Sequence, residues 1–342
     1  FGKDRVSNRT HLIATALVAV GTSFSAFWIL SLNSWMQTPT GYRIEDGVFF
    51  VESWWEVIFN PSFPYRFAHM FTASLLTAAF LIMGISAWRA MRGVDGPATW
   101  KVMRTGALMA AVLAPLQVFI GDLHGLNTLE HQPAKIAAME GIWETEKGAP
   151  LTLFGFPDEE EKTTHMAIKV PNLASLILTH EWDGEVLGLN EFEGETPPVA
   201  PVFWAFRVMV GIGMLMVLVG WWSAWRLFRN RDESRETQTW LLRALSVMTF
   251  SGWIAVLAGW YVTEIGRQPW VVDGLLRTAD VVADHSSATV AGTLFGYVLL
   301  YLFLLVSYIA TLRYMATKPA RSLTLTPQQR AMNDAETAEG EA

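Results

Sequence analysis

The chain has 342 residues, of which 51% are hydrophobic and only 17% are charged, a balance typical of polytopic membrane proteins rather than soluble domains of this length. Its formal net charge of -7 argues against nucleic acid as a partner, because phosphate binding needs a basic face. The absence of Cys excludes disulfides, thiolate metal sites and c-type heme attachment, so any metal or heme would use His, Met or carboxylate ligands.

Six segments of about 20 residues are long and apolar enough to cross a membrane. We therefore expect an all-α integral membrane fold, a transmembrane helix bundle with six spans in this chain and one long extracytoplasmic loop. Ser7 or Thr10 is a candidate cap of the first helix, and a polar cluster at 284–287 marks the start of the last. The expected spans are 11–32, 67–87, 102–120, 202–222, 245–262 and 289–312.

These spans divide the chain into eight regions, in which single spans and two-span hairpins alternate with loops on the outer side. The tail is polar enough to predict disorder. The regions are 1–32, the first span with a cytoplasmic lead-in; 33–66, an outer loop; 67–121, a two-span hairpin; 122–201, an extracytoplasmic loop; 202–262, a second two-span hairpin; 263–288, another outer loop; 289–316, the last span; and 317–342, a disordered cytoplasmic tail.

Basic residues gather on one side of the predicted membrane, before the first span, in two short connections and after the last span. By the positive-inside rule this side is cytoplasmic, so both ends of the chain are expected in the cytoplasm. The opposite loops are acidic, and 122–201 exceeds ordinary helix connections, which is typical of functional or disordered segments. Because the chain begins at Phe1 in a charged stretch, we expect it to be the remainder of a longer polypeptide.

Glu264 stands out at the outer end of the fifth span, where an apolar segment meets a carboxylate, Arg267 and a helix-stopping proline. A carboxylate at bilayer depth costs about 2.5–3.5 kcal/mol near a helix centre and less toward an end, so it needs a partner. That partner is either Arg267, at the helical spacing i and i+3, or an ion or cofactor. Trp260, one turn earlier, is either an interfacial aromatic residue or a neighbour of such a site.

His69 and Met209 lie on the same outer face of the predicted bundle as Glu264, and both have small residues at helical spacing beside them. Small neighbours leave room for a flat group, but they also allow close helix packing. An isolated His in a span makes an interhelical hydrogen bond, relays protons or ligates a metal, while Met is ordinary core filler. Together, however, His and Met are the axial pair of an electron-transfer heme, and a carboxylate is a possible ligand of a second heme. Arg207 is either an interfacial anchor or a partner for a heme propionate.

At this point the residues carry a resemblance to subunit I of the cytochrome bd-type ubiquinol oxidases, which extends to about Met315. The closest-looking branch is the cyanide-insensitive oxidase-like one, because the segment from Glu140 to Arg207 lacks the long insertion of the quinol loop in the other branch. The matching stretches are Asn33-Ser-Trp-Met-Gln37, Arg66-Phe-Ala-His69, Lys135-Ile-Ala-Ala-Met-Glu140 with Trp143-Glu-Thr, Phe206-Arg-Val-Met209-Val-Gly211, and Glu264-Ile-Gly-Arg-Gln-Pro-Trp270.

The resemblance implies a role for each matching residue. His69 and Met209 are then the axial ligands of low-spin heme b, and Glu264 is a ligand of high-spin heme b. Lys135 and Glu140 are implied to contact the quinol headgroup in the quinol-binding loop, although a solvated charged helix face is the alternative reading of these two. The residues implied to lie beside the hemes are Arg207, Trp260 and Arg267.

The family resemblance also implies the activity: electrons from ubiquinol pass through low-spin heme b, high-spin heme b and heme d, or heme b in its place, to reduce oxygen to water. Quinol protons leave outside and oxygen takes up protons from inside, which creates a proton gradient without pumping. The implied location is the bacterial inner membrane, and the implied partners are subunit II and small single-span subunits.

The sequence departs from this family at its front, because subunit I has nine spans and three of them would precede Phe1. That part of the family's subunit carries a histidine, which is the remaining high-spin heme ligand, and the acidic residues of the proton path to heme d. This chain alone is therefore not expected to hold a complete oxygen site. A polytopic transporter or ion channel subunit, with Glu264 and His69 as proton or ion relays, remains the alternative from the residues themselves.

Overall fold

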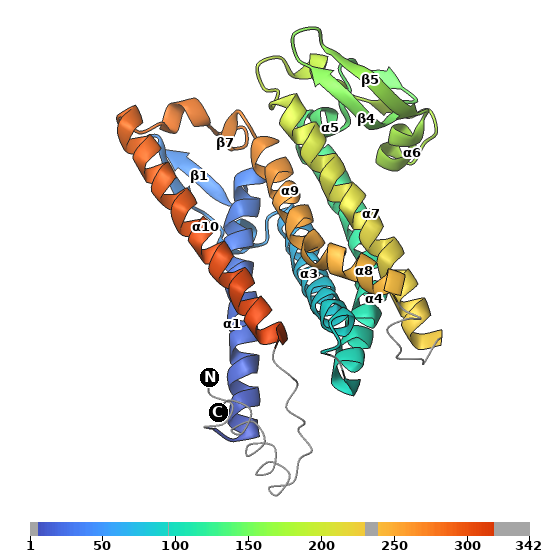
Figure 1. The fold of residues 1–342 in the computed structure, drawn as a ribbon. Coiled ribbons are helices and arrows are strands. Elements are labelled where there is room, and N and C mark those ends of the chain that lie inside the picture. Colours follow the sequence, from blue (N-terminus) through green and yellow to red (C-terminus); the bar gives the residue numbers. More distant parts are fainter. Residues whose placement is uncertain (1–5, 95, 230–238, 318–342) are drawn as a thin grey trace, which may run out of the picture.

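The computed structural model describes residues 6–94, 96–229 and 239–317 (Figure 1). Within this part of the chain, six helical stretches are long and apolar enough to cross a membrane, which confirms the predicted all-α membrane fold. Each stretch extends beyond its predicted span at both ends. They are α1 (Asn8–Gln37), α2 (Trp54–Ile58) with α3 (Phe63–Met91), α4 (Pro97–His131), α7 (Val199–Arg229), α8 (Thr239–Val247) with α9 (Ser251–Ile265), and α10 (Ser287–Thr317).

Polar residues begin the first and last helices, as the sequence predicts. The Ser7 hydroxyl accepts a hydrogen bond from the Thr10 backbone N–H at 3.2 Å, which makes Ser7 the cap of α1. Ser286 accepts one from the Thr289 backbone N–H at the same distance at the start of α10. Residues 1–5, before α1, and 318–342, which contain nearly all of the predicted disordered tail, lie outside the described residues.

The core of the bundle lies between α3, α4, α7 and α8, where large apolar side chains face small ones. Gly106 of α4 shows how close the helices approach, because a Cβ added there would lie 2.6 Å from Met83 Cγ and 2.9 Å from the Ala79 carbonyl oxygen. Close approach at small residues is the usual packing mode of membrane helices. The most apolar windows of α1 and α10, in contrast, are 0% buried within the chain, so these helices present their apolar faces outward.

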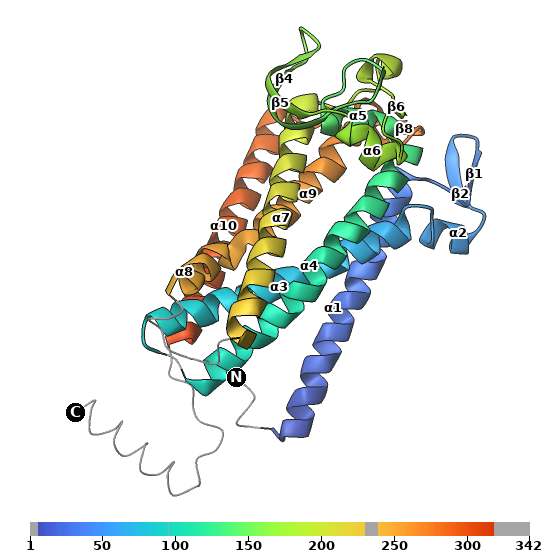
Figure 2. The same ribbon diagram turned by 90° about the vertical axis from the view of Figure 1, so that its right-hand side faces the viewer.

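The short elements gather at the end of the bundle that is uppermost in Figures 1 and 2, where α1, α4 and α9 end and α3, α7 and α10 begin. The strands form four two-stranded antiparallel sheets in the described residues. These elements are β1 (Tyr42–Glu45) with β2 (Val48–Val51), α5 (Pro133–Glu140), β3 (Glu146–Lys147) with β6 (Glu185–Val186), β4 (Leu151–Asp158) with β5 (Thr163–Val170), α6 (Leu173–Thr179), β7 (Trp270–Val272) with β8 (Leu276–Arg277), and the 3-10 turns Leu189–Phe192 and Thr278–Val281. A further 3-10 turn, Met248–Phe250, joins α8 to α9 within the bundle.

The loop between α4 and α7 is therefore an ordered structure rather than a disordered segment. Its β4–β5 hairpin is attached to the bundle, because the Glu159 carboxylate in the hairpin turn accepts a hydrogen bond from the Val199 backbone N–H at 2.8 Å. Val199 is the first residue of α7, so an acidic side chain stands at that helix N-terminus, where it is stabilising.

Candidate functional site

Glu264, in the last turn of α9, has a partner for each carboxylate oxygen. Its Oε2 accepts a hydrogen bond from Arg267 Nη2 at 2.7 Å, so the ion pair weighed from the sequence is present. Its Oε1 accepts a second hydrogen bond at 2.7 Å from Asn33 Nδ2 of α1. Trp260 is half-buried one turn earlier on α9. The carboxylate is thus fixed between two helices, with the orientation of both oxygens determined.

Arg267 keeps donors that this pair does not use. Its side chain is 7% exposed, and neither Nε nor Nη1 has a hydrogen-bond partner among residues 6–94, 96–229 and 239–317. An arginine presents five N–H donors in a planar fork, so one bond to Glu264 leaves most of its capacity available. Arg267 is therefore equipped to bind a further acceptor beside Glu264.

His69 lies on α3 against α4, where Gly121 makes room for its ring. A Cβ added at Gly121 would lie 3.2 Å from His69 Cε1. A second histidine, His124, is one turn further along α4, with ring centroids 5.5 Å apart. In the described part of the chain, neither His69 Nδ1 nor His124 Nε2 has a hydrogen-bond partner. The sequence allowed an interhelical hydrogen bond for His69, and its Nδ1 forms none with the described residues.

Met209 lies on α7 and meets a glycine in the same way. A Cβ added at Gly259 of α9 would lie 3.0 Å from Met209 Sδ, which is tighter than ordinary van der Waals contact, so the glycine gives the thioether room. No hydrogen bond joins Met209 to His69 among the described residues. Each of the two predicted axial ligands thus faces a glycine on a neighbouring helix.

Lys135, on the short helix α5, is 3% exposed. Its Nζ donates hydrogen bonds to Gln37 Oε1 and Gln132 Oε1, both at 2.6 Å. A Cβ added at Gly266 would lie 3.0 Å from Lys135 Cγ, so the glycine that follows Glu264 accommodates the lysine stem. Burial lowers the pKa of the Lys135 ammonium well below its usual range, and the nearby Arg66 adds repulsion.

The hydrogen bonds of Lys135 continue into the loop that follows α9. Gln132 Nε2 donates to Asp273 Oδ1 at 3.0 Å, and the Asp273 backbone N–H donates to the Met36 carbonyl at 3.0 Å. Burial raises the pKa of Asp273, against the effect of the Gln132 hydrogen bond. The network joins α1, α5 and the loop after α9 around Lys135, so this lysine has a fixed position.

Glu140, at the end of α5, is 5% exposed and points toward Arg207. The two residues approach to 3.9 Å between Glu140 Oε2 and Arg207 Nη2. Burial raises the pKa of Glu140 to about 7, and Arg207 opposes that rise. Since Lys135 and Glu140 are both buried, the alternative of a solvated charged face is wrong.

The guanidinium of Arg207 is bound mainly to backbone. Its Nη1 donates to the carbonyls of Met139 at 2.7 Å and Phe203 at 2.9 Å, and its Nη2 donates to the Thr152 carbonyl at 2.5 Å. Arg207 therefore holds α5 and strand β4 against α7. Its predicted place beside a heme stays a prediction.

Arg66 lies at the same end of the bundle, and the sequence predicts no role for it. It is 6% exposed, on α3 one turn before His69, and it interacts electrostatically with Glu264 and Arg267. No hydrogen bond or ion pair joins its guanidinium to another described residue, and its Nε is buried without a partner there. The argument that singled out Glu264, an ionised group at membrane depth, applies to Arg66 equally and would have found it.

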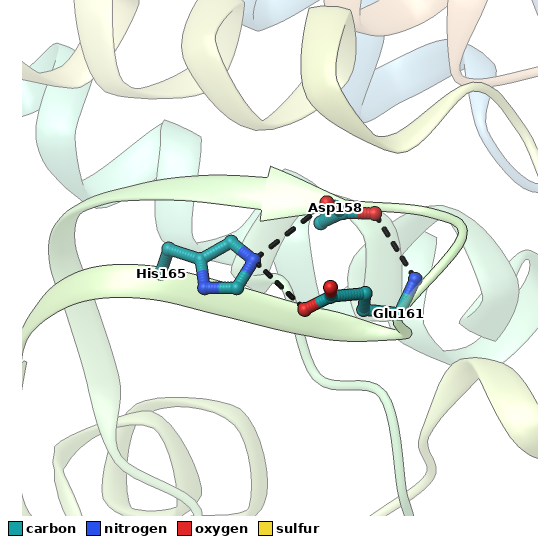
Figure 3. Close-up of side chains that lie close together, drawn as sticks. All are labelled: Asp158, Glu161 and His165. Atoms are coloured by element: carbon teal, nitrogen blue, oxygen red, sulfur yellow. Dashed lines mark hydrogen bonds and ion pairs between the residues drawn. The ribbon is translucent and has the colours of Figure 1, made fainter.

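One further cluster of ligand-type side chains lies at the β4–β5 turn (Figure 3). His165 Nε2 is 3.6 Å from Asp158 Oδ2 and 3.3 Å from Glu161 Oε2, with His165 side chain 49% exposed. Backbone N–H groups of Glu161 and Glu160 lower the pKa of Asp158, and they fold the turn around it. These side chains lie close together at the surface, where exposed polar contacts contribute little to stability.

The chain is similar to known proteins over most of its length. The family model described as cytochrome bd terminal oxidase subunit I matches residues 1–320. Cytochrome bd ubiquinol oxidase subunit 1 of Bacillus subtilis (strain 168) is 35% identical over 301 residues, which cover 84% of this chain and 63% of that protein. The chain thus spans less than two thirds of that relative's length.

Two further relatives cover more. Cytochrome bd-II ubiquinol oxidase subunit 1 of Escherichia coli (strain K12) is 30% identical over 401 residues, covering 96% of this chain and 77% of that protein. The structure of bd oxidase from Geobacillus thermodenitrificans matches with a TM-score of 0.81 and 32% sequence identity, covering 91% of this chain and 71% of that one.

Proposed function

Because the chain belongs to the cytochrome bd terminal oxidase subunit I family, we propose that it is the heme-bearing catalytic subunit of a quinol:oxygen oxidoreductase. In this proposal the subunit lies in a bacterial inner membrane with both termini cytoplasmic. It works with subunit II, and with small single-span subunits, to oxidise ubiquinol at the outer face and to reduce oxygen to water. Quinol protons leave on that side, so a proton gradient forms without pumping.

The observation that carries the proposal is the last turn of α1, where Asn33 and Gln37 are four residues apart on one helix face. Asn33 binds Glu264 and Gln37 binds Lys135. One rigid element therefore holds the residue expected to ligate a heme and the residue expected to contact the quinol. Such an arrangement suits electron transfer between a quinol and a neighbouring heme.

Lys135 and Glu140 supply the chemistry for the quinol. The Lys135 Nζ, already donating to two amide oxygens, presents its remaining donor to a quinol oxygen. Glu140, whose pKa burial raises to about 7, is poised to take up a proton from the quinol hydroxyl near neutral pH. Arg207, at 3.9 Å, stabilises the ionised carboxylate of Glu140 that accepts this proton.

The side chains present fit the heme cofactors of the proposal. Low-spin heme b, high-spin heme b and heme d, or heme b in place of heme d, would carry the electrons from quinol to oxygen. His69, whose buried Nδ1 has no partner in the described residues, and Met209, beside Gly259, would hold the low-spin heme. Glu264 would hold the high-spin heme with Arg267 and Trp260 beside it, in exchange for one of its present hydrogen bonds.

The proposal is tested on the complex purified from its membrane with all its subunits. Reduced-minus-oxidised and pyridine hemochrome spectra measure the hemes, and oxygen consumption is followed after addition of ubiquinol. We expect bands of low-spin and high-spin b-type heme, and quinol-dependent oxygen uptake. A complex without heme would refute the oxidase and would favour the transporter alternative, in which Glu264 and His69 relay ions.

A further inference from the structure

Arg66 carries a buried charge that the described residues leave unpaired. Its side chain is 6% exposed, and none of the described residues forms a hydrogen bond or ion pair with it. Moving an ion out of water costs several kcal/mol, which excellent geometry and hydrogen bonding normally offset. A buried guanidinium therefore calls for an acceptor that the described side chains do not supply.

The nearby carboxylate does not fill this role. Glu264 interacts electrostatically with Arg66, but its two oxygens already accept hydrogen bonds from Arg267 and Asn33. Arg267 itself retains unused donors, so these two arginines exceed the one carboxylate in charge. Carboxylates match the arginine fork with two parallel hydrogen bonds, which makes a second carboxylate the best complement.

The position of Arg66 indicates where that carboxylate comes from. Residues three apart on a helix share a face, so Arg66 and His69 look into the same space. His124, with its ring centroid 5.5 Å from that of His69 and its Nε2 buried without a partner in the described chain, borders this space from α4. Arg207, in contrast, has its guanidinium bound to three backbone carbonyls.

We propose that Arg66, with His124 beside it, binds a propionate carboxylate of the heme held by His69. This inference rests on the proposed function, since it requires a heme at His69. It adds an anion-binding residue that fixes the orientation of the porphyrin and places a positive charge next to it. That charge favours the reduced heme and so raises its midpoint potential.

The test compares Arg66→Gln and Arg66→Lys with Arg43→Gln in the full complex. Arg43 is a matched control, because its side chain is 57% exposed on the outer strand β1. Heme content per polypeptide is measured by pyridine hemochrome, and the midpoint potential of each b-type heme by redox titration. Protein assembled in the membrane is quantified alongside, so a folding defect is recognised.

Arg66→Gln is expected to weaken retention of the low-spin heme roughly tenfold or more, as for the loss of a charge-assisted hydrogen bond. The low-spin heme that remains should have a lower midpoint potential, because a neighbouring positive charge is gone. Arg66→Lys keeps the positive charge and a similar side-chain volume. Its low-spin heme should therefore have a midpoint potential close to that of the parent. Arg43→Gln should behave as the parent.

Three results would overturn the inference. One is an unchanged low-spin heme content and potential in Arg66→Gln. Another is a shift confined to the high-spin heme, which would assign Arg66 to the porphyrin at Glu264. The third is a midpoint potential of the low-spin heme in the parent complex that changes with the concentration of added phosphate or chloride. Arg66 would then bind a free anion. In each case the parent complex contains heme, whereas failure of the proposed function itself would appear as a parent without heme.

Discussion

Two buried cations at the same end of the bundle, Lys135 and Arg66, differ in the partners that the fold gives them. Lys135 is 3% exposed and has two amide acceptors at 2.6 Å, whereas Arg66 is 6% exposed and has no partner among the described residues. The difference teaches that burial alone does not indicate what a charge is for. In the functions proposed here, Lys135 is held by its own acceptors next to the quinol, while Arg66 waits for an acceptor supplied by a heme.

The largest expected effect on the site around Arg66 comes from replacing the predicted axial ligands of the low-spin heme. His69→Ala or Met209→Leu should abolish the low-spin heme signal in reduced-minus-oxidised spectra while membrane insertion remains intact. His165→Ala and Met166→Leu, on the exposed hairpin strand β5, are matched controls that should leave the spectrum unchanged. Retention of the signal in both ligand variants would refute the axial pair.

A smaller change on the same side uses the glycines of α4. A Cβ at Gly121 would lie 3.2 Å from His69 Cε1, whereas a Cβ at Gly125, one turn further, meets nothing within 4 Å. Overpacking of this kind costs typically 1–3 kcal/mol, so Gly121→Ala should lower low-spin heme content only partly. Gly125→Ala gains the same helix propensity and serves as the control. Equal heme spectra from the two variants would contradict the proposal that His69 faces the low-spin heme.

The Lys135 side should respond in substrate affinity rather than in heme content. Lys135→Ala is expected to raise the apparent KM for ubiquinol roughly tenfold or more, because a hydrogen bond to a charged group contributes about 1.5–3 kcal/mol. Gln37→Leu removes one of the two acceptors of Lys135 and should raise the KM less. Lys147→Ala, on the exposed strand β3, is the control. If the KM of Lys135→Ala matched that of Lys147→Ala, the quinol would bind elsewhere.

The most subtle distinction is in pH dependence. Since burial raises the pKa of Glu140 to about 7, only part of the population carries the ionised carboxylate near neutral pH. Because the ionised form accepts the quinol proton, kcat/KM should rise as pH increases through about 7. In Glu140→Gln the rate should be lower and this rise should disappear, as read from steady-state kinetics across that range. Persistence of the same profile in Glu140→Gln would assign the titration to another group.

Much of the fold follows from the sequence because apolar length and polar helix starts are local properties. All six spans, the Ser7 cap and the existence of an ordered partner for Glu264 in Arg267 are of this kind. What the sequence did not reveal depends on contacts between distant segments. Asn33 and Glu264 are 231 residues apart in the chain, and Gln37 and Lys135 are 98 apart, so no spacing rule connects them.

Arg66 differs from these cases, because its meaning depends on the partners that it lacks. The stretch Arg66-Phe-Ala-His69 points to the histidine, yet the sequence cannot tell a paired from an unpaired arginine. Glu140 is similar: its separation from Lys135 by five positions left a solvated face open, and only burial at 5% exposure excludes it. Whether such a side chain is buried depends on how segments distant in the sequence, such as α7 and the loop between α4 and α7, pack against it.

The last turn of α1 has a thermodynamic consequence. Asn33 and Gln37 share one rigid helix, so strengthening the bond of Asn33 to Glu264 and strengthening that of Gln37 to Lys135 both select the same placement of that turn. If a heme and a quinol bind at Glu264 and Lys135 as proposed, their binding is linked by a coupling free energy, and linkage is reciprocal. By whatever factor a ligand at Glu264 changes the affinity for quinol, quinol must change the affinity of that ligand by the same factor.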